Sequence, residues 1–353
     1  MNATKLLMRR FAVFGLRSSV WERAFPSALY QAVLRNILLA GCCLGILLGV
    51  AVGSAAAAKM PVAASIAPLG DFCRHLGGDL VEVQVLIPPG ANLHAFEPAP
   101  SVIARASQAR IFIYIGAGLE PWAARVLHVQ EAKDRVVVAA AAGIPLLEAG
   151  DHGHGPEEAH EGKGPGPHEP EGEHHHKEDK HQHQSGNPHI WLDPVLAKDI
   201  CRRVSAALIK ADPAHAARYE ANLRSYLAAL DELDQEYRTQ INTWRQKAFI
   251  SFHPAFSYLA RRYGLREVGV MEVTPGREPT PRHMQGIVAA VRHSGVKVMF
   301  TEAQFNPRVA QVIAQEAGVK VLVLDPMGGK PPYGSDYLQL MRHNLAVMAE
   351  AMK

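Results

Sequence analysis

Eight short runs of apolar, β-branched residues recur along this chain and alternate with stretches of helical character. Four of the runs lie at 61–67, 81–87, 110–116 and 135–141. Four more lie at 248–252, 266–270, 296–300 and 319–324, and a long amphipathic helical pattern from 213 to about 243 separates the two sets. Strands that alternate with helices are typical of parallel α/β sheets. The sequence therefore predicts an α/β fold with two parallel-sheet lobes joined by one long helix.

The first 58 residues have the composition of an export signal. No charge occurs from Asn36 to Ala58, Arg35 and five other basic residues precede this run, and small residues before Lys59 fit an A-x-A cleavage site. We therefore expect residues 1–58 to be a signal peptide and the protein to be periplasmic. Two alternatives are a signal-anchored form, because the run is long enough to span a bilayer, and a form lipid-anchored at Cys42 of the sequence LAGC.

Net charge and cysteine content narrow the function of the remaining chain. Removing residues 1–58 takes away six basic residues and one acid, which moves the formal net charge from +3 to −2. No clustered basic surface for nucleic acid is expected, because phosphate binding requires grouped Lys and Arg. Cys73 and Cys201 are the two cysteines that remain, and they could pair or stay free, with no C-x-x-C motif to indicate zinc or redox chemistry.

Residues 150–186 form a segment rich in histidine, acids, glycine and proline. Such a segment has too little apolar surface to offset its ordering entropy, so we expect a disordered insert. His density of this kind indicates weak metal capture, and the alternative is an acidic linker without a metal role. The candidate capture residues are His152, His154, His160, His168, His174, His175, His176, His181 and His183.

Potential metal ligands follow several of the predicted strands. His94 comes after the second strand, His253 directly follows the fifth, Glu302 comes after the seventh and Asp325 directly follows the eighth, whereas His189 lies just past the His-rich insert. Ligands of parallel α/β proteins bind beyond the carboxyl ends of the strands. The side chains of His94, His189, His253 and Asp325 would supply three imidazoles and one carboxylate, which suits tetrahedral Zn²⁺.

Six segments carry a resemblance to a known family. They read, in chain order, IPPGANLHAFEPAPS, NPHIWLDP, SFHPAFSYLARRYGL, GREPTP, FTEAQF and LDPMGG. In this order they resemble the metal-specific solute-binding proteins of zinc and manganese ABC transporters, over essentially the whole mature chain. The resemblance implies two lobes with four-stranded, mainly parallel sheets flanked by helices, a rigid linking helix, and an ion held in the cleft between the lobes.

Carried over by position, the resemblance implies that His94 and His189 bind the ion from the first lobe and His253 and Asp325 bind it from the second. It places Glu302 beside the site as a supporting acid. The corresponding domains are a signal at 1–58, an N-terminal lobe at 59–212 with the insert 150–186, a linking helix at 213–245 and a C-terminal lobe at 246–353. In the family, manganese carriers tend to have a carboxylate at the position of His253, and imidazole favours zinc.

The predicted function is therefore the capture of Zn²⁺ outside the cytoplasm and its delivery to an ABC permease membrane subunit with its ATPase. We expect a monomer that is not an enzyme and does not bind nucleic acid. The alternatives within the family are a manganese carrier, a metal-dependent adhesin and a periplasmic zinc buffer. A more distant alternative is a secreted zinc hydrolase with Glu302 as the base, although the chain has no H-E-x-x-H motif.

Overall fold

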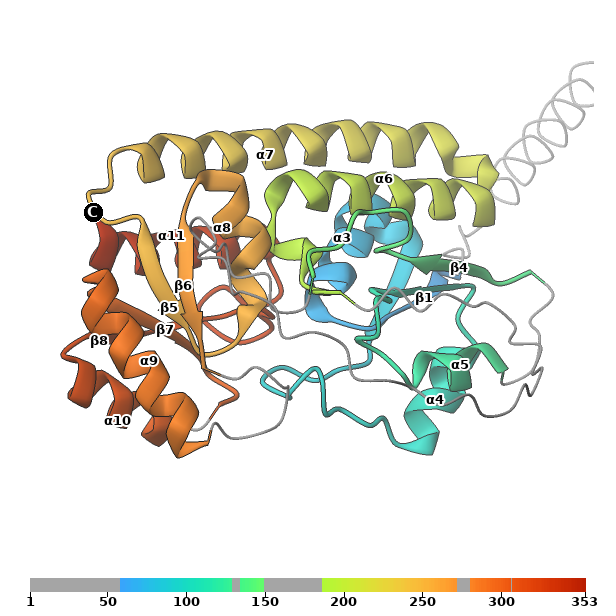
Figure 1. Cartoon of the computed structure of the whole chain (residues 1–353). Coiled ribbons are helices and arrows are strands. Elements are labelled where there is room, and N and C mark those ends of the chain that lie inside the picture. Colours follow the sequence, from blue (N-terminus) through green and yellow to red (C-terminus); the bar gives the residue numbers. More distant parts are fainter. Residues whose placement is uncertain (1–57, 129–133, 149–185, 272–279, 306) are drawn as a thin grey trace, which may run out of the picture. The chain divides into compact units, whose positions relative to one another are not determined.

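The computed structural model describes residues 58–128, 134–148, 186–271, 280–305 and 307–353 (Figure 1). The predicted signal, apart from Ala58, and all nine candidate histidines of the insert lie outside the described residues. Among the residues that are described, no helix is both long enough and apolar enough to cross a membrane.

The first lobe is built on a four-stranded parallel sheet with the strand order β2-β1-β3-β4. Its strands are β1 (Met60–Ala64), β2 (Val81–Val85), β3 (Ile111–Tyr114) and β4 (Val136–Ala139). Its helices are α3 (Ala67–Gly77), α4 (Pro100–Ser107), α5 (Ala123–His128) and α6 (Pro194–Ala211), with short 3-10 turns η2 (Gly78–Leu80) and η3 (Ile190–Leu192). Prolines open α4 and α6 because proline suits the first helical position, where its missing N–H is not needed.

The second lobe repeats this plan with the strand order β6-β5-β7-β8, again all parallel. Its strands are β5 (Ala248–Ser251), β6 (Arg266–Val270), β7 (Val298–Glu302) and β8 (Lys320–Leu324). Its helices are α8 (Ser257–Tyr263), α9 (Pro281–Ser294), α10 (Pro307–Ala317) and α11 (Tyr337–Met352), with the 3-10 turn η5 (Pro254–Phe256). All eight predicted strands are therefore present, and the predicted fold class is confirmed.

The long helix α7 (Ala216–Asn242) connects the two sets of strands and packs against α3 and α6 as well as α8 and α11 (Figure 1). We predicted that it begins at Pro213, but residues Pro213–His215 form a 3-10 turn (η4) before the α-helix starts. The apolar side chains that predicted this helix face the core. Five are buried and two are partly buried against it, namely Tyr219, Tyr226, Leu230, Leu233 and Tyr237, and Leu223 and Leu227.

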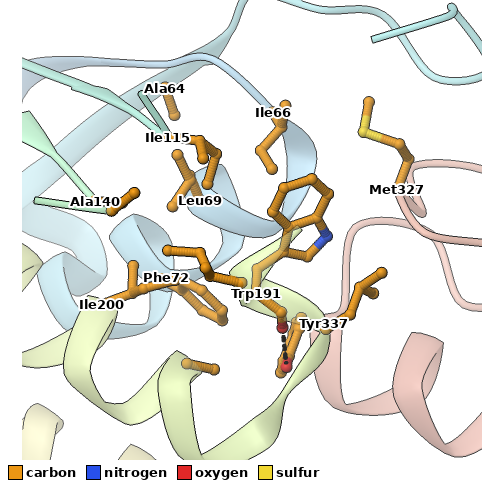
Figure 2. Close-up of a cluster of buried hydrophobic side chains, with 14 of the residues drawn as sticks. Ala64, Ile66, Leu69, Phe72, Ile115, Ala140, Trp191, Ile200, Met327 and Tyr337 are labelled. Carbon is orange, nitrogen blue, oxygen red and sulfur yellow. Dashed lines mark hydrogen bonds between the residues drawn. The ribbon is translucent and has the colours of Figure 1, made fainter. Parts of the chain in front are cut away.

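One hydrophobic core extends through both lobes. It includes strand residues of the first sheet, such as Ile113, and of the second, such as Phe300, while the opposite face of the second sheet has a separate cluster around Ile250. Trp191 lies at the junction: its Nε1 donates to the Pro326 carbonyl at 2.7 Å and its own carbonyl accepts from the Tyr337 hydroxyl at 2.6 Å. Figure 2 shows this tryptophan between side chains that come from both halves of the chain.

The shared strand order determines where a ligand can bind. In the first sheet β2 lies on one side of β1, whereas β3 and β4 lie on the other side, so the strand order reverses between β1 and β3, the switch point of this sheet. In the second sheet the order reverses in the same way between β5 and β7. Ligands of open parallel sheets bind beyond the strand ends at such a point. His253 follows β5 and Glu302 ends β7, so both residues lie at the switch point of the second sheet.

Candidate metal site

His189 is the most enclosed of the predicted ligands, with 1% of its surface exposed. It directly precedes η3, whose residues are fully buried, so its backbone is held by the core of the first lobe. Asn187 fixes its ring: Oδ1 accepts from the His189 backbone N–H at 3.0 Å and lies 2.7 Å from His189 Nδ1. Because a carbonyl oxygen only accepts, Nδ1 carries the proton and Nε2 keeps its lone pair free for a metal.

His253 is held in the same way from the second lobe. It follows β5, is 3% exposed, and its Nδ1 lies 3.2 Å from Oε1 of Glu302 at the end of β7. The other oxygen of Glu302 accepts from Gln304 Nε2 at 2.5 Å. A carboxylate that receives Nδ1–H fixes both the tautomer and the direction of the imidazole, as it does for many metal-binding histidines. Nε2 of His253 is then the ring nitrogen that carries the lone pair.

His94 lies on the irregular connection between β2 and α4 and is only partly buried. Its backbone N–H donates to the Asn92 side chain at 3.0 Å. The connection packs on the first lobe through Phe96, whose ring meets that of Trp122 edge-on at 6.3 Å. The His94 ring itself lies edge-on to the rings of His189 and His253, at centroid distances of 5.2 and 4.9 Å.

The three imidazoles converge on one point. One ligand atom from each of His94, His189 and His253 lies within 4.8 Å of the other two. Nε2 of His94 and Nε2 of His189 are 3.3 Å apart. Two nitrogen ligands at about 2.0–2.1 Å from a tetrahedral zinc ion would be separated by roughly 3.3 Å. The spacing of this pair therefore matches two corners of a zinc coordination shell.

Burial keeps the rings of His94 and His189 in the neutral form that binds metal. Desolvation, and then the neighbouring His253, lower the pKa of His94 from 6.5 to about 4. The same causes, with His94 in addition, hold the pKa of the His189 ring well below its ordinary value. A neutral imidazole offers a lone pair, whereas a protonated one repels a cation. Both rings are consequently ready to coordinate at neutral pH.

Comparisons with known proteins agree with this geometry. The family described as "zinc-uptake complex component A periplasmic" (ZnuA) matches residues 62–351. The chain belongs to the ZnuA family. The chain is 33% identical over 298 residues to the high-affinity zinc uptake system protein ZnuA of Bacillus subtilis, a match that covers 83% of this chain and 88% of that protein.

Solved structures show the same fold as this ZnuA family member. A crystal structure of ZnuA has 29% sequence identity and a TM-score of 0.69, over 84% of this chain and 100% of that one. The laminin-binding protein of Streptococcus agalactiae, described as a bifunctional protein with adhesin and metal transporting activity, has 29% identity and a TM-score of 0.67, with 84% and 100% covered. The predicted family and fold are thus confirmed.

Asp325, the fourth predicted ligand, does not belong to the group of converging donor atoms found in the described part of this ZnuA homologue. Its Oδ1 accepts from the backbone N–H groups of Met327 and Gly328 at 2.8 and 2.9 Å, and its Oδ2 accepts from the Tyr333 hydroxyl. The structure therefore brings three of the four predicted ligands together and engages the fourth in hydrogen bonds.

Sequence reasoning missed the residues that orient the histidines. Asn187 also donates from Nδ2 to the Pro254 carbonyl at 2.6 Å, so one side chain touches the segments of both His189 and His253. Glu267, buried in β6, accepts from the hydroxyls of Ser251 and Ser257, which lie on either side of His253. An acid at a buried position of a strand is unusual, because a buried charge requires partners. That signal could have identified Glu267, whereas nothing in the local pattern indicates the reach of Asn187.

The two remaining cysteines are free. Cys73 in α3 and Cys201 in α6 are both fully buried, and desolvation raises the pKa of each thiol, to about 12 for Cys73. Thiolate is the reactive form of cysteine, so neither group has the properties of a nucleophile or of a metal ligand. The open question of pairing is answered in this structure by two separate, unreactive thiols.

Proposed function

We propose that this protein captures Zn²⁺ between its two lobes with the imidazoles of His94, His189 and His253 and delivers the ion to an ABC permease. The observation that carries the proposal is the convergence of three imidazole rings, two of which have Nε2 atoms 3.3 Å apart. His94 and His189 come from the first half of the chain and His253 from the second, so a bound ion links the two lobes. An ion-dependent lobe arrangement gives a permease a way to recognise the loaded protein.

The ligand set favours zinc over manganese. Imidazole nitrogen suits Zn²⁺, whereas Mn²⁺ prefers oxygen ligands, and the three converging donors are all nitrogen. We propose Asp325 as the fourth ligand. To bind the ion, its carboxylate must give up part of its present hydrogen bonding. We assign Glu302 the supporting role of orienting His253. The nine insert histidines are proposed as a weak capture segment.

Membership of a zinc-uptake family supports the proposed partners and location. The chain acts outside the cytoplasm, exported by residues 1–58, and its partners are a membrane permease and the ATPase of the same transporter. We propose that it works as a monomer, with an N-terminal lobe at 59–212, a linking segment at 213–245 that contains α7, and a C-terminal lobe at 246–353. Lipid-anchored and signal-anchored forms are variants of the same location.

Members of the family are described as components of zinc-uptake complexes. The site has few features of a hydrolytic centre. A catalytic zinc needs a base that can reach its bound water. Glu302, the candidate base, is 4% exposed and has both oxygens engaged, one with His253 Nδ1 and one with Gln304. An acid held in this way is placed to orient the ring of His253. We therefore propose that the protein is not an enzyme.

A second candidate function is adhesion, which one relative favours because it is described as both adhesin and metal transporter. Zinc uptake in cells that lack this chain separates the candidates. If this protein is a transport component, deletion of its gene abolishes growth under zinc limitation and added zinc restores it. An adhesin or a zinc buffer predicts normal uptake of scarce zinc in the deletion strain.

The binding function is tested by titrating the purified protein with zinc, together with a variant that lacks residues 151–184. We expect one tight site in both proteins, since His94, His189, His253 and Asp325 are present in each, and additional weak binding in the parent alone. Calorimetry against a competing chelator measures both classes of site. Equal stoichiometry in the two proteins would reduce the insert to a linker, and loss of the tight site from the variant would place zinc binding in the insert.

A further inference from the structure

Asp325 is held more firmly than an ordinary loop residue. Its backbone N–H donates to Asn344 Oδ1 at 2.9 Å and its carbonyl accepts from Asn344 Nδ2 at 2.7 Å, while Asn344 is fully buried in α11. Two backbone amides hold Oδ1 of its carboxylate, and the Tyr333 hydroxyl holds Oδ2. With Oδ1 engaged twice, Oδ2 is the oxygen with the fewest partners, and Tyr333 is its donor.

Tyr333 is itself fixed by a short hairpin, residues 328–334. The hairpin is closed by the Gly329 N–H, which donates to the Gly334 carbonyl at 2.5 Å, and by the Gly334 N–H, which donates to the Lys330 carbonyl at 2.8 Å. The Tyr333 ring also packs on the His343 ring at 5.0 Å. These contacts position the hydroxyl beside the Asp325 carboxylate.

The hairpin 328–334 also touches the segment that leads to His94. A methyl group added to Gly329, which has a φ of 86°, would come within 2.6 Å of Pro89 Cγ. A methyl group added to Gly90 would likewise come too close to Nζ of Lys330. Both Pro89 and Gly90 precede His94 in the connection between β2 and α4. The hairpin is therefore supported by both lobes, directly beside the loop that carries one of the three histidines.

We propose that Tyr333 is a specificity-determining residue, because it holds the Asp325 carboxylate outside the cluster of His94, His189 and His253. This inference rests on the proposed function of that cluster. Asp325 is not among the converging donor atoms, so its carboxylate must leave its present position to reach the ion. Leaving breaks the hydrogen bond from Tyr333, which weakens coordination by Asp325, the proposed fourth ligand, relative to coordination by the three imidazoles.

The effect on selectivity follows from the preferences of the metals. A hydrogen bond to a charged group contributes about 1.5–3 kcal/mol, which corresponds to roughly a 10-fold to 100-fold change in an equilibrium constant. Mn²⁺ gains more than Zn²⁺ from an added carboxylate, because manganese prefers oxygen ligands. Releasing Asp325 should thus strengthen manganese binding more than zinc binding.

The test is the substitution Tyr333→Phe in the full chain, which removes one hydroxyl and keeps the ring on His343. We expect Mn²⁺ affinity, measured by calorimetry, to rise about 10-fold relative to Zn²⁺ affinity. The matched control is Tyr219→Phe, because Tyr219 donates to Asp212 at 2.7 Å far along the chain and should leave the ratio unchanged. Thermal unfolding of the metal-free variants checks that both are folded.

A second background separates a role through Asp325 from a general structural role. In an Asp325→Ala chain, Tyr333→Phe should leave the ratio of the two affinities unchanged, since the hydroxyl then has no carboxylate to hold. An unchanged or lower Mn²⁺ to Zn²⁺ affinity ratio in Tyr333→Phe alone would overturn the inference, as would an equal effect in the Asp325→Ala background. A parent protein that binds no zinc tightly would instead refute the proposed function, whatever Tyr333 does.

Discussion

His189 and His253 differ from His94 in how the fold holds them. The first two are almost fully buried, and each has its Nδ1 fixed by a named partner, Asn187 or Glu302. His94 lies on an irregular connection, is partly exposed, and its ring is positioned by the loop and by the other two rings. Two of the proposed ligands are thus preorganised by packed elements, and the third is supplied by a loop. Loops tolerate rearrangement better than packed elements, so entry and release of the ion should involve the His94 side.

The largest expected effect comes from His253→Ala. Zinc sites with four protein ligands bind with about 10–16 kcal/mol, so one ligand accounts for roughly 3 kcal/mol, and its loss should weaken binding about 100-fold or more. His94→Ala should cost less, because the preorganised pair of His189 and His253 survives. Competition with a chelator measures both, with the exposed His293→Ala of α9 as the control. An equal or larger loss of zinc affinity in His94→Ala would contradict the distinction between the two fixed histidines and the histidine on the loop.

Acid should destabilise the metal-free protein through the rings of His94 and His189. The pKa of His94 is about 4 in the folded chain against 6.5 for the free group. Between these values the unfolded chain binds a proton that the folded chain does not, so the free energy of unfolding falls as pH drops from 6.5 to about 4. The contribution of His94 is about 3 kcal/mol, and His189 adds to it in the same direction.

Urea denaturation of the metal-free protein at pH 7.5 and pH 4.5 measures this loss. His94→Asn should reduce the difference between the two pH values, whereas the exposed His293→Asn should retain it. A parent protein with the same free energy of unfolding at both pH values would show that the rings are not held neutral by burial. Such a result would also remove the electrostatic difference between these histidines and an exposed one.

A smaller effect is expected from Asn187→Ala, which removes no ligand. The variant loses the contacts to His189 and to the Pro254 carbonyl, and removing a group that orients a metal ligand typically costs 10–100-fold in affinity. We expect about a 10-fold loss of zinc affinity. Asn222→Ala is the matched control, since Asn222 donates to the Leu76 carbonyl at 2.9 Å away from the site. Unchanged affinity in Asn187→Ala would show that packing alone orients His189.

The eight strands, their division into two sets and the candidate histidines could all be predicted from local sequence pattern. Period, length and residue type are local properties, so the run before His253 and the pattern of α7 could be read directly. The resemblance of six short segments then predicted the family correctly. The order of strands in each sheet, which places His253 at a switch point, is not encoded in any one of these runs.

Packing between distant segments of the chain fixes which of these side chains meet and which atoms they present. His94 and His189 are 95 residues apart in sequence, and their Nε2 atoms lie 3.3 Å apart because the neighbouring residues Leu93 and Ile190 pack into the same hydrophobic core. The tautomer of His189 depends on its hydrogen bond to Asn187, and the Asp325 carboxylate accepts a hydrogen bond from Tyr333. Hydrogen bonds of this kind are sensitive to differences in distance of a few tenths of an ångström. Packing fixes distances this closely, and local sequence pattern does not.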